Sequence, residues 1–84
     1  MEDFCRILKE LRLDKKISQK KLADIIGTNN SSVCDWECGR TQPNIEMIIK
    51  LCLFFDVSAD YMFGLEDESG IKLRKKITSQ KKDV

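Results

Sequence analysis

The sequence predicts an all-α fold in which five helices pack into one compact bundle. Apolar residues recur at helical spacing along most of the chain, and glycine and proline fall in the gaps between these periodic segments. No strand-like alternation occurs before residue 70. At 84 residues the chain suits one small domain, because separate hydrophobic cores need about 50 residues or more each.

The first two predicted helices are short and amphipathic. Residues 3–15 carry apolar side chains at helical spacing, namely Phe4, Ile7, Leu8 and Leu11. Ser18 is a favourable N-cap for a second helix, which we expect to end at Gly27, because glycine readily takes the left-handed conformation that ends helices. The residues that this helix is expected to bury are Leu22, Ile25 and Ile26.

Three further helices follow. Thr28 or Asn29 is expected to cap a third helix that runs to about Cys38 and ends at Gly39. Pro43 closes the next loop, and Asn44 caps a fourth helix over residues 45–55. One face of this helix carries Ile45, Ile48, Ile49 and Cys52, with Leu51 and Phe55 beside them. A short fifth helix is predicted between Ser58, its cap, and Gly64; it contains Tyr61, Met62 and Phe63.

The predicted helices end near Leu65, and EDESG at residues 66–70 has the composition of a linker, so we divide the chain into a domain at residues 1–65 and a linker with a basic C-terminal tail at residues 66–84. The first part holds nine Lys or Arg against ten Asp or Glu, a net charge of −1, and the second holds six against four, a net charge of +2. Three interpretations of the tail stay open: a solvated segment, a dimerisation strand or helix, or a basic arm that touches phosphate.

The four cysteines predict neither a disulfide framework nor a metal site. The first ten residues, MEDFCRILKE, lack the apolar core of a signal peptide, so we expect the reducing cytoplasm, where structural disulfides are rare. A structural zinc site needs four ligands, usually in two close pairs, and the chain has no histidine and no C-x-x-C motif. The cysteines are Cys5, Cys34, Cys38 and Cys52.

The sequence also argues against a membrane protein and against an enzyme. No apolar run reaches the ~18 residues that a membrane-spanning helix needs. The chain lacks a glycine-rich phosphate loop and a plausible pair of catalytic carboxylates. We therefore expect no catalytic activity and no cofactor.

The second and third helices are spaced as in a helix-turn-helix. Counting from Gln19, Ala23 comes fifth and provides the small side chain that two steeply crossing helices need where they meet. Gly27 comes ninth, where a tight turn requires a positive φ. Val33 and Trp36, three residues apart, are expected to face inward and to hold the third helix against the first two. In such a motif the second helix of the pair enters the major groove of DNA.

The combination of motifs resembles the lambdoid phage repressor and Cro class of helix-turn-helix regulators, the XRE-like family. The resemblance covers roughly residues 4–65 and rests on SQKKLA, then W-E-x-G-R, then P-N, and finally FDVSADYMFG. It implies a repressor-type DNA-binding domain that acts as a homodimer on a near-palindromic operator in double-stranded DNA.

The resemblance also implies roles for individual residues. The outward face of the third helix would read base edges through Asn30, Ser31, Cys34 and Asp35. Gln19 matches a family position that contacts phosphate, and Arg40 and Asn44 lie where the DNA backbone should pass. Lys20 is either a source of non-specific attraction or only a solubilising charge, and Cys38, on the outward face of the helix, is also assigned to phosphate. Arg12 and Glu37 match a pair that bridges the first and third helices. Asp35 departs from the family, which mostly places a neutral or basic residue there; its carboxylate either accepts from a cytosine amino group or contacts nothing.

Two further expectations concern partners and cysteines. Leu53, with Met47 and Phe54 near it, marks a possible dimer contact, because the family pattern usually has a polar residue at position 53. Cys34 and Cys38 are four residues apart on one helix, with Cβ vectors expected not to aim at each other, so an unstrained disulfide is disfavoured and mild oxidant should leave DNA affinity unchanged. The alternative function is an antitoxin or an antagonist of another regulator, with the tail wrapping the toxin or regulator.

Overall fold

A computed structural model describes residues 2–65 of the chain, and all regular structure in that range is helical. Five helices follow one another: α1 (Glu2–Asp14), α2 (Gln19–Ile26), α3 (Asn30–Cys38), α4 (Ile45–Phe55) and α5 (Ala59–Met62). The predicted linker and tail, residues 66–84, lie outside the described residues. The prediction of an all-α, five-helix fold is confirmed.

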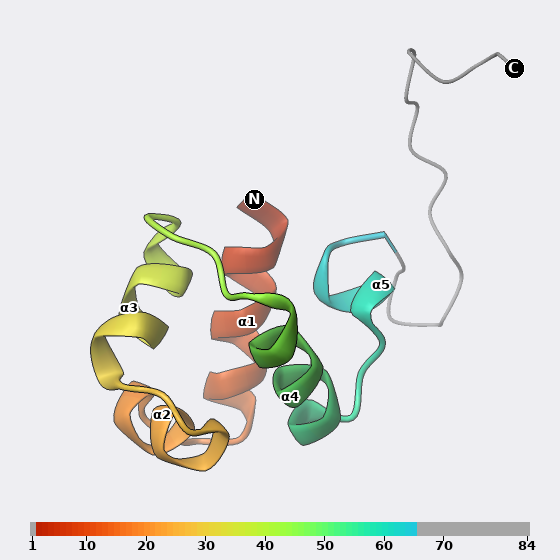
Figure 1. The fold of residues 1–84 in the computed structure, drawn as a ribbon. Coiled ribbons are helices and arrows are strands. Elements are labelled where there is room, and N and C mark those ends of the chain that lie inside the picture. Colours follow the sequence, from red (N-terminus) through yellow and green to blue (C-terminus); the bar gives the residue numbers. More distant parts are fainter. Residues whose placement is uncertain (1, 66–84) are drawn as a thin grey trace, which may run out of the picture.

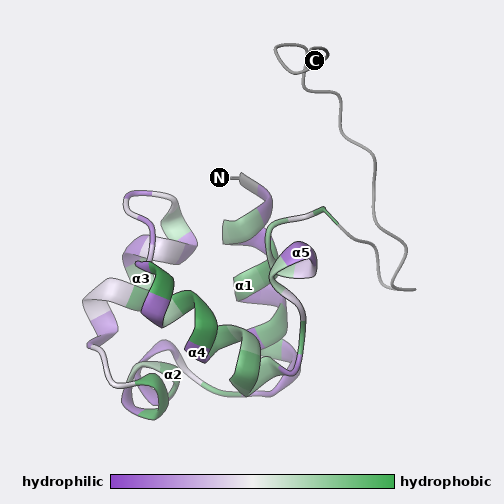
Figure 2. Cartoon of the chain, turned by 45° about the vertical axis from the view of Figure 1, so that its right-hand side comes forward, coloured by the Kyte–Doolittle hydropathy of each residue, from purple (hydrophilic) through white to green (hydrophobic). Residues whose placement is uncertain are grey.

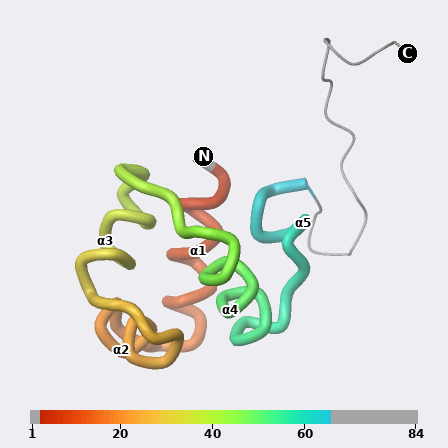
Figure 3. The backbone as a smooth tube through the Cα atoms, in the orientation of Figure 1, coloured from red at the N-terminus to blue at the C-terminus, as the bar shows by residue number. Residues whose placement is uncertain are grey.

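Helix α1 lies between α3 and α5 in Figure 1, and α2 packs against α3 and α4. Helix α3 packs against α1 and α2, while α5 packs against α1 and α4. The tube in Figure 3 shows that α2 and α3 lie on the opposite side of α1 from α5. Every helix contributes to a single core, which consists of Phe4, Ile7, Leu8, Leu22, Ala23, Ile26, Val33, Trp36, Leu51, Phe55 and Met62.

Capping side chains set the helix starts that the sequence predicts. The Ser18 hydroxyl accepts a hydrogen bond from the backbone N–H of Lys21 at 3.0 Å, and this contact begins α2. Of the two candidates for α3, Asn29 is the cap, since its side-chain oxygen accepts from the Ser32 N–H at 2.8 Å. Such a contact satisfies one of the backbone donors that a helix leaves unpaired at its start.

The turn between α2 and α3 depends on Gly27. Its φ of 84° lies in the left-handed region, where a side chain would be strained. Its N–H and that of Thr28 both donate to the Ala23 carbonyl, at 2.9 and 2.8 Å. The ammonium of Lys50, on α4, adds a hydrogen bond to the Ile26 carbonyl at 3.3 Å. This hydrogen bond connects the turn to α4.

The prediction that Ile25 is buried in the core is wrong. Its side chain is exposed, and Ala23 occupies the inward position beside Leu22 and Ile26. At 3.6 residues per turn, Ile25 lies roughly 100° from the centre of the stripe that these three residues form. An eight-residue helix that is covered on one side only leaves that flank in solvent.

Helix α4 is apolar on more than one side. It is mostly green in Figure 2, and its inward face carries Leu51 and Phe55. The side chains of Ile45, Ile49 and Leu53 follow at i, i+4 and i+8 on the opposite face, where they are 74%, 54% and 76% exposed. An apolar stripe therefore runs along the outside of α4, which we call the α4 stripe (Ile45, Ile49 and Leu53).

Candidate nucleic-acid interface

Two buried residues decide which way α3 faces. Val33 is fully buried and Trp36 is 5% exposed, so both are anchored in the core against α1 and α2. Helical geometry then turns the other side of α3 outward. The residues on this outward face are Asn30, Ser31, Cys34, Asp35 and Cys38; Cys34 and Asp35 are half-buried and the others exposed.

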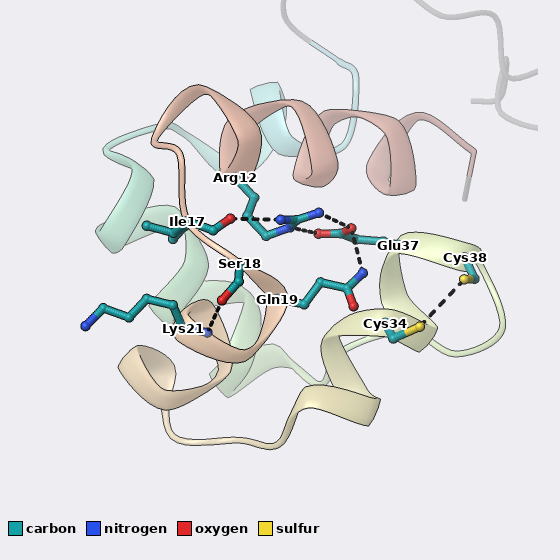
Figure 4. Close-up of polar contacts among 8 residues, drawn as sticks. All are labelled: Arg12, Ile17, Ser18, Gln19, Lys21, Cys34, Glu37 and Cys38. Atoms are coloured by element: carbon teal, nitrogen blue, oxygen red, sulfur yellow. Dashed lines mark hydrogen bonds and ion pairs between the residues drawn. The ribbon is translucent and has the colours of Figure 1, made fainter.

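A buried ion pair joins α1 to α3 (Figure 4). The Arg12 guanidinium donates to both carboxylate oxygens of Glu37, through Nε at 2.6 Å and Nη2 at 3.1 Å. The Glu37 side chain is only 3% exposed. A third Arg12 donor, Nη1, reaches the Ile17 carbonyl at 2.8 Å in the loop before α2. The structure thus contains the bridge that the resemblance implies.

Gln19 completes this cluster. Its side-chain amide donates from Nε2 to Glu37 Oε1 at 3.1 Å, as Figure 4 shows. Glu37 therefore accepts hydrogen bonds from α1 and from the first residue of α2, and it fixes both relative to α3. The resemblance gives Gln19 a phosphate contact; here its amide also positions the carboxylate that holds α3.

Asp35 has a partner within the protein. Its Oδ1 accepts from Arg40 Nη1 at 3.2 Å; the Arg40 side chain is 62% exposed and that of Asp35 is 36% exposed. The backbone N–H of Arg40 also donates to the Asp35 carbonyl at 2.9 Å, beyond Gly39, where the helix ends. The acid on the outward face is therefore paired with the arginine that the resemblance assigns to phosphate.

The two cysteines of α3 face each other. Their sulfur atoms lie 4.0 Å apart, and Figure 4 shows both side chains on the same side of the helix. The two side chains lie on neighbouring turns of one helix face, as their i, i+4 spacing requires, and both cysteines are free thiols. That mild oxidant leaves DNA affinity unchanged remains a prediction. The hydrogen bond with Cys38 is the main cause that raises the pKa of the Cys34 thiol.

The other positions assigned to phosphate lie at or next to helix ends. Lys20 is exposed on α2 and pairs with Asp24 at 3.3 Å, one turn further on. Asn44 caps α4 by accepting from the Met47 N–H at 2.9 Å. Gln19 and Lys20 lie at the start of α2, Cys38 at the end of α3, and Arg40 just after it. Their roles in DNA contact remain predictions.

Apart from the Arg12–Glu37 bridge, sequence reasoning missed the contacts that cross a helix end or join two helices. Asp35 and Arg40 are five residues apart, outside the i, i+3 and i, i+4 spacings that flag helical ion pairs. No spacing rule connects Gln19 with Glu37. The exposure of Ile45 and Ile49 could have been predicted from the sequence, because both share a helical stripe with Leu53.

The fold and the outward α3 define the chain as a helix-turn-helix protein. A helix-turn-helix family model matches residues 8–62. The chain is 33% identical over 73 residues to the HTH-type transcriptional regulator YobD of Bacillus subtilis (strain 168), a match that covers 87% of the chain and 65% of YobD. The chain thus spans less than two thirds of that relative's length.

Solved structures of helix-turn-helix regulators have the same fold as this chain. The P22 c2 repressor, crystallised with a synthetic operator, has a TM-score of 0.68 and 29% identity over 70% of this chain and 89% of that one. The restriction-modification controller protein C.AhdI of Aeromonas hydrophila has a TM-score of 0.67 and 32% identity over 74% and 94%. The chain belongs to the helix-turn-helix family of DNA-binding transcriptional regulators, of the Cro and repressor (XRE) type.

The family assignment confirms the resemblance seen in the sequence. It places the chain among transcriptional regulators and not among enzymes, as predicted. Among the described helices, none has the length and apolar character needed to cross a membrane.

Proposed function

We propose that this protein is a repressor that recognises a near-palindromic operator through the outward face of α3 in the major groove. The observation that carries this proposal is the orientation of α3, since Val33, Trp36 and Glu37 hold one side and leave the polar side exposed. Asn30 is suited to a bidentate contact with adenine, and Ser31 to either kind of base. The protein would act in the cytoplasm, where operator DNA is accessible.

Phosphate contacts would fix the position of α3 without reading sequence. Gln19 and Lys20 lie at the start of α2, where unpaired backbone N–H groups favour an anion. Arg40 lies just beyond the end of α3 and Asn44 at the start of α4. These groups come before and after α3 in the chain, which makes them candidates to contact the DNA backbone on either side of the groove.

The α4 stripe supports a homodimer. A continuous row of three exposed aliphatic side chains pairs with itself when a second copy is placed across a twofold axis. Of the three residues predicted from the sequence for this contact, Leu53 lies on the stripe, while Met47 and Phe54 are half-buried against the core. A twofold dimer matches a palindromic operator with half-sites about 34 Å apart.

Selection of bound duplexes from a random pool tests the proposal. We expect an inverted repeat to be enriched, with half-sites about one helical turn apart and an affinity that falls steeply with salt. Equal affinity for all duplexes would overturn the proposal. A single, unrepeated half-site would overturn its dimeric part only.

The pairing of Asp35 with Arg40 yields a prediction about affinity. We expect Asp35→Asn to raise affinity for random duplexes, because it removes a negative charge from the reading face and releases Arg40 for phosphate. The plot of log affinity against log salt should steepen by about 1 for each additional phosphate contact.

Glu10→Gln is the matched control for this change. It removes the same charge from α1, where Glu10 pairs with Arg6 in solvent and neither residue is assigned to DNA contact. A similar gain in both variants would show that net charge alone is responsible. If Asp35 instead accepts from a cytosine amino group, Asp35→Asn would relax base preference at one position of the selected site.

The alternative function, an antitoxin or an antagonist of a second regulator, depended on the tail. Residues 66–84 lie outside the described residues, and nothing in residues 2–65 favours a toxin or a second regulator as the partner.

A further inference from the structure

We propose that Cys34 and Cys38 together bind Cu(I), and that the bound ion weakens binding to DNA. The proposal rests on the function proposed above, since the pair lies on the face of α3 that is assigned to base and phosphate contacts. The ligand class is a soft monovalent cation that accepts two thiolates.

The positions of the sulfur atoms suit a two-coordinate ion. Cys34 Sγ and Cys38 Sγ are 4.0 Å apart and lie on the same side of the helix (Figure 4). A metal–sulfur bond of about 2.3 Å, the length known for zinc thiolates, spans a gap of this size with an angle of about 120° at the metal. A rotation about χ1 of either cysteine widens the gap and opens this angle. The backbone of α3 does not have to move.

The surroundings select a soft ion of low coordination number. Within residues 2–65, no group of three or more potential metal-ligating side chains comes together, so a zinc ion would lack two of its four ligands there. Thiolates on their own favour Cu(I). Both thiols are free cysteines, and Cys38 is exposed, so an ion reaches the pair from solvent.

Binding changes the charge of the reading face. Two thiols lose their protons to solvent, two sulfur–copper bonds form, and copper stays in the +1 state, so no electrons are transferred. The pair thereby changes from neutral to a net charge of −1. A new anion on the surface that meets phosphate opposes DNA binding.

Arg40 adds a second effect. Its Nη2 lies 3.9 Å from Cys38 Sγ, while its Nη1 contacts Asp35 at 3.2 Å. A thiolate–copper anion next to this guanidinium holds it on the protein and away from phosphate. Loss of a phosphate contact and gain of a repulsive charge act in the same direction.

Titration of the reduced full-length protein against a chromogenic Cu(I) chelator, without oxygen, tests the site. We expect one Cu(I) per chain, lost in both Cys34→Ser and Cys38→Ser and retained in the controls Cys5→Ala and Cys52→Ala. Zn(II) at the same concentration should not bind. Circular dichroism checks that each variant is folded. Equal Cu(I) binding by the wild type and both serine variants, or none by the wild type, would overturn the proposal.

The same proteins with the selected duplex test the regulation. One equivalent of Cu(I) should weaken wild-type binding by about 5- to 150-fold, and saturating duplex should weaken Cu(I) binding by the same factor. Cu(I) should leave the DNA affinity of the two serine variants unchanged, even if that affinity differs from the wild-type value. Unchanged DNA affinity in copper-loaded wild type would overturn the regulatory part. A protein that prefers no duplex would disprove the proposed function, while the chelator titration would still decide whether the site exists.

Discussion

Glu37→Ala is expected to destabilise the domain by about 3–5 kcal/mol, the usual cost of removing one partner of a buried ion pair. The substitution leaves the Arg12 guanidinium buried without its carboxylate and removes the acceptor for Gln19. Domains of this size have stabilities near the lower end of the usual range, about 5 kcal/mol, so most of the folded population would be lost on mild heating. Urea denaturation followed by tryptophan fluorescence measures the change, since Trp36 is the single tryptophan and is buried.

The double variant Arg12→Met with Glu37→Leu separates burial of a charge from loss of packing. Replacing both partners by apolar residues of similar size removes the unpaired charge, so stability should recover most of the way. Glu10→Ala is the surface control, because Glu10 pairs with Arg6 in solvent and its removal should cost less than about 1 kcal/mol. If Glu37→Ala destabilises the domain no more than Glu10→Ala does, the pair does not hold α3 in place.

Leu53→Glu is expected to make the protein monomeric and to lower affinity for the palindromic operator by about 10²–10⁴-fold. The new carboxylate lies within the interface that the α4 stripe is proposed to form, where burying an unpaired charge among apolar side chains is costly. Each protomer would then bind its half-site alone and lose the gain from linked binding. Sedimentation equilibrium gives the oligomeric state, and titration of the selected duplex gives the affinity.

Leu13→Glu is the matched control for this effect. Leu13 is exposed on α1, is not part of the α4 stripe, and receives the same change of charge. We expect it to remain dimeric with nearly wild-type affinity. If Leu13→Glu loses as much affinity as Leu53→Glu does, the added charge explains the effect, and the α4 stripe is not the dimer interface.

The parts of the fold that follow local rules were predictable from the sequence. Ser18, Asn44 and Ser58 start helices where their side chains cap, and Gly27 and Gly39 end helices in the left-handed conformation. The inward orientation of Val33 and Trp36 follows from their spacing. These features depend on residues within a few positions of one another, where helical geometry leaves few alternatives.

The parts that depend on partners in space were less predictable. Ile25 has the spacing of a core residue, but the helices packed against α2 do not reach its side chain, which is exposed. The pairing of Asp35 with Arg40 crosses the end of a helix, and the facing of the two thiols depends on side-chain torsions that spacing does not set. For the candidate site, the sequence identified which residues share the outward face but not which contact each other.

The division of α3 into two faces separates recognition from folding. Val33, Trp36 and Glu37 connect this nine-residue helix to the rest of the domain, and none of the five outward residues contributes to the core. Asn30, Ser31 and their neighbours are therefore open to exchange without loss of the hydrophobic contacts that keep the chain folded. A new set of side chains grafted onto this face would give regulators with other target sequences on the same scaffold.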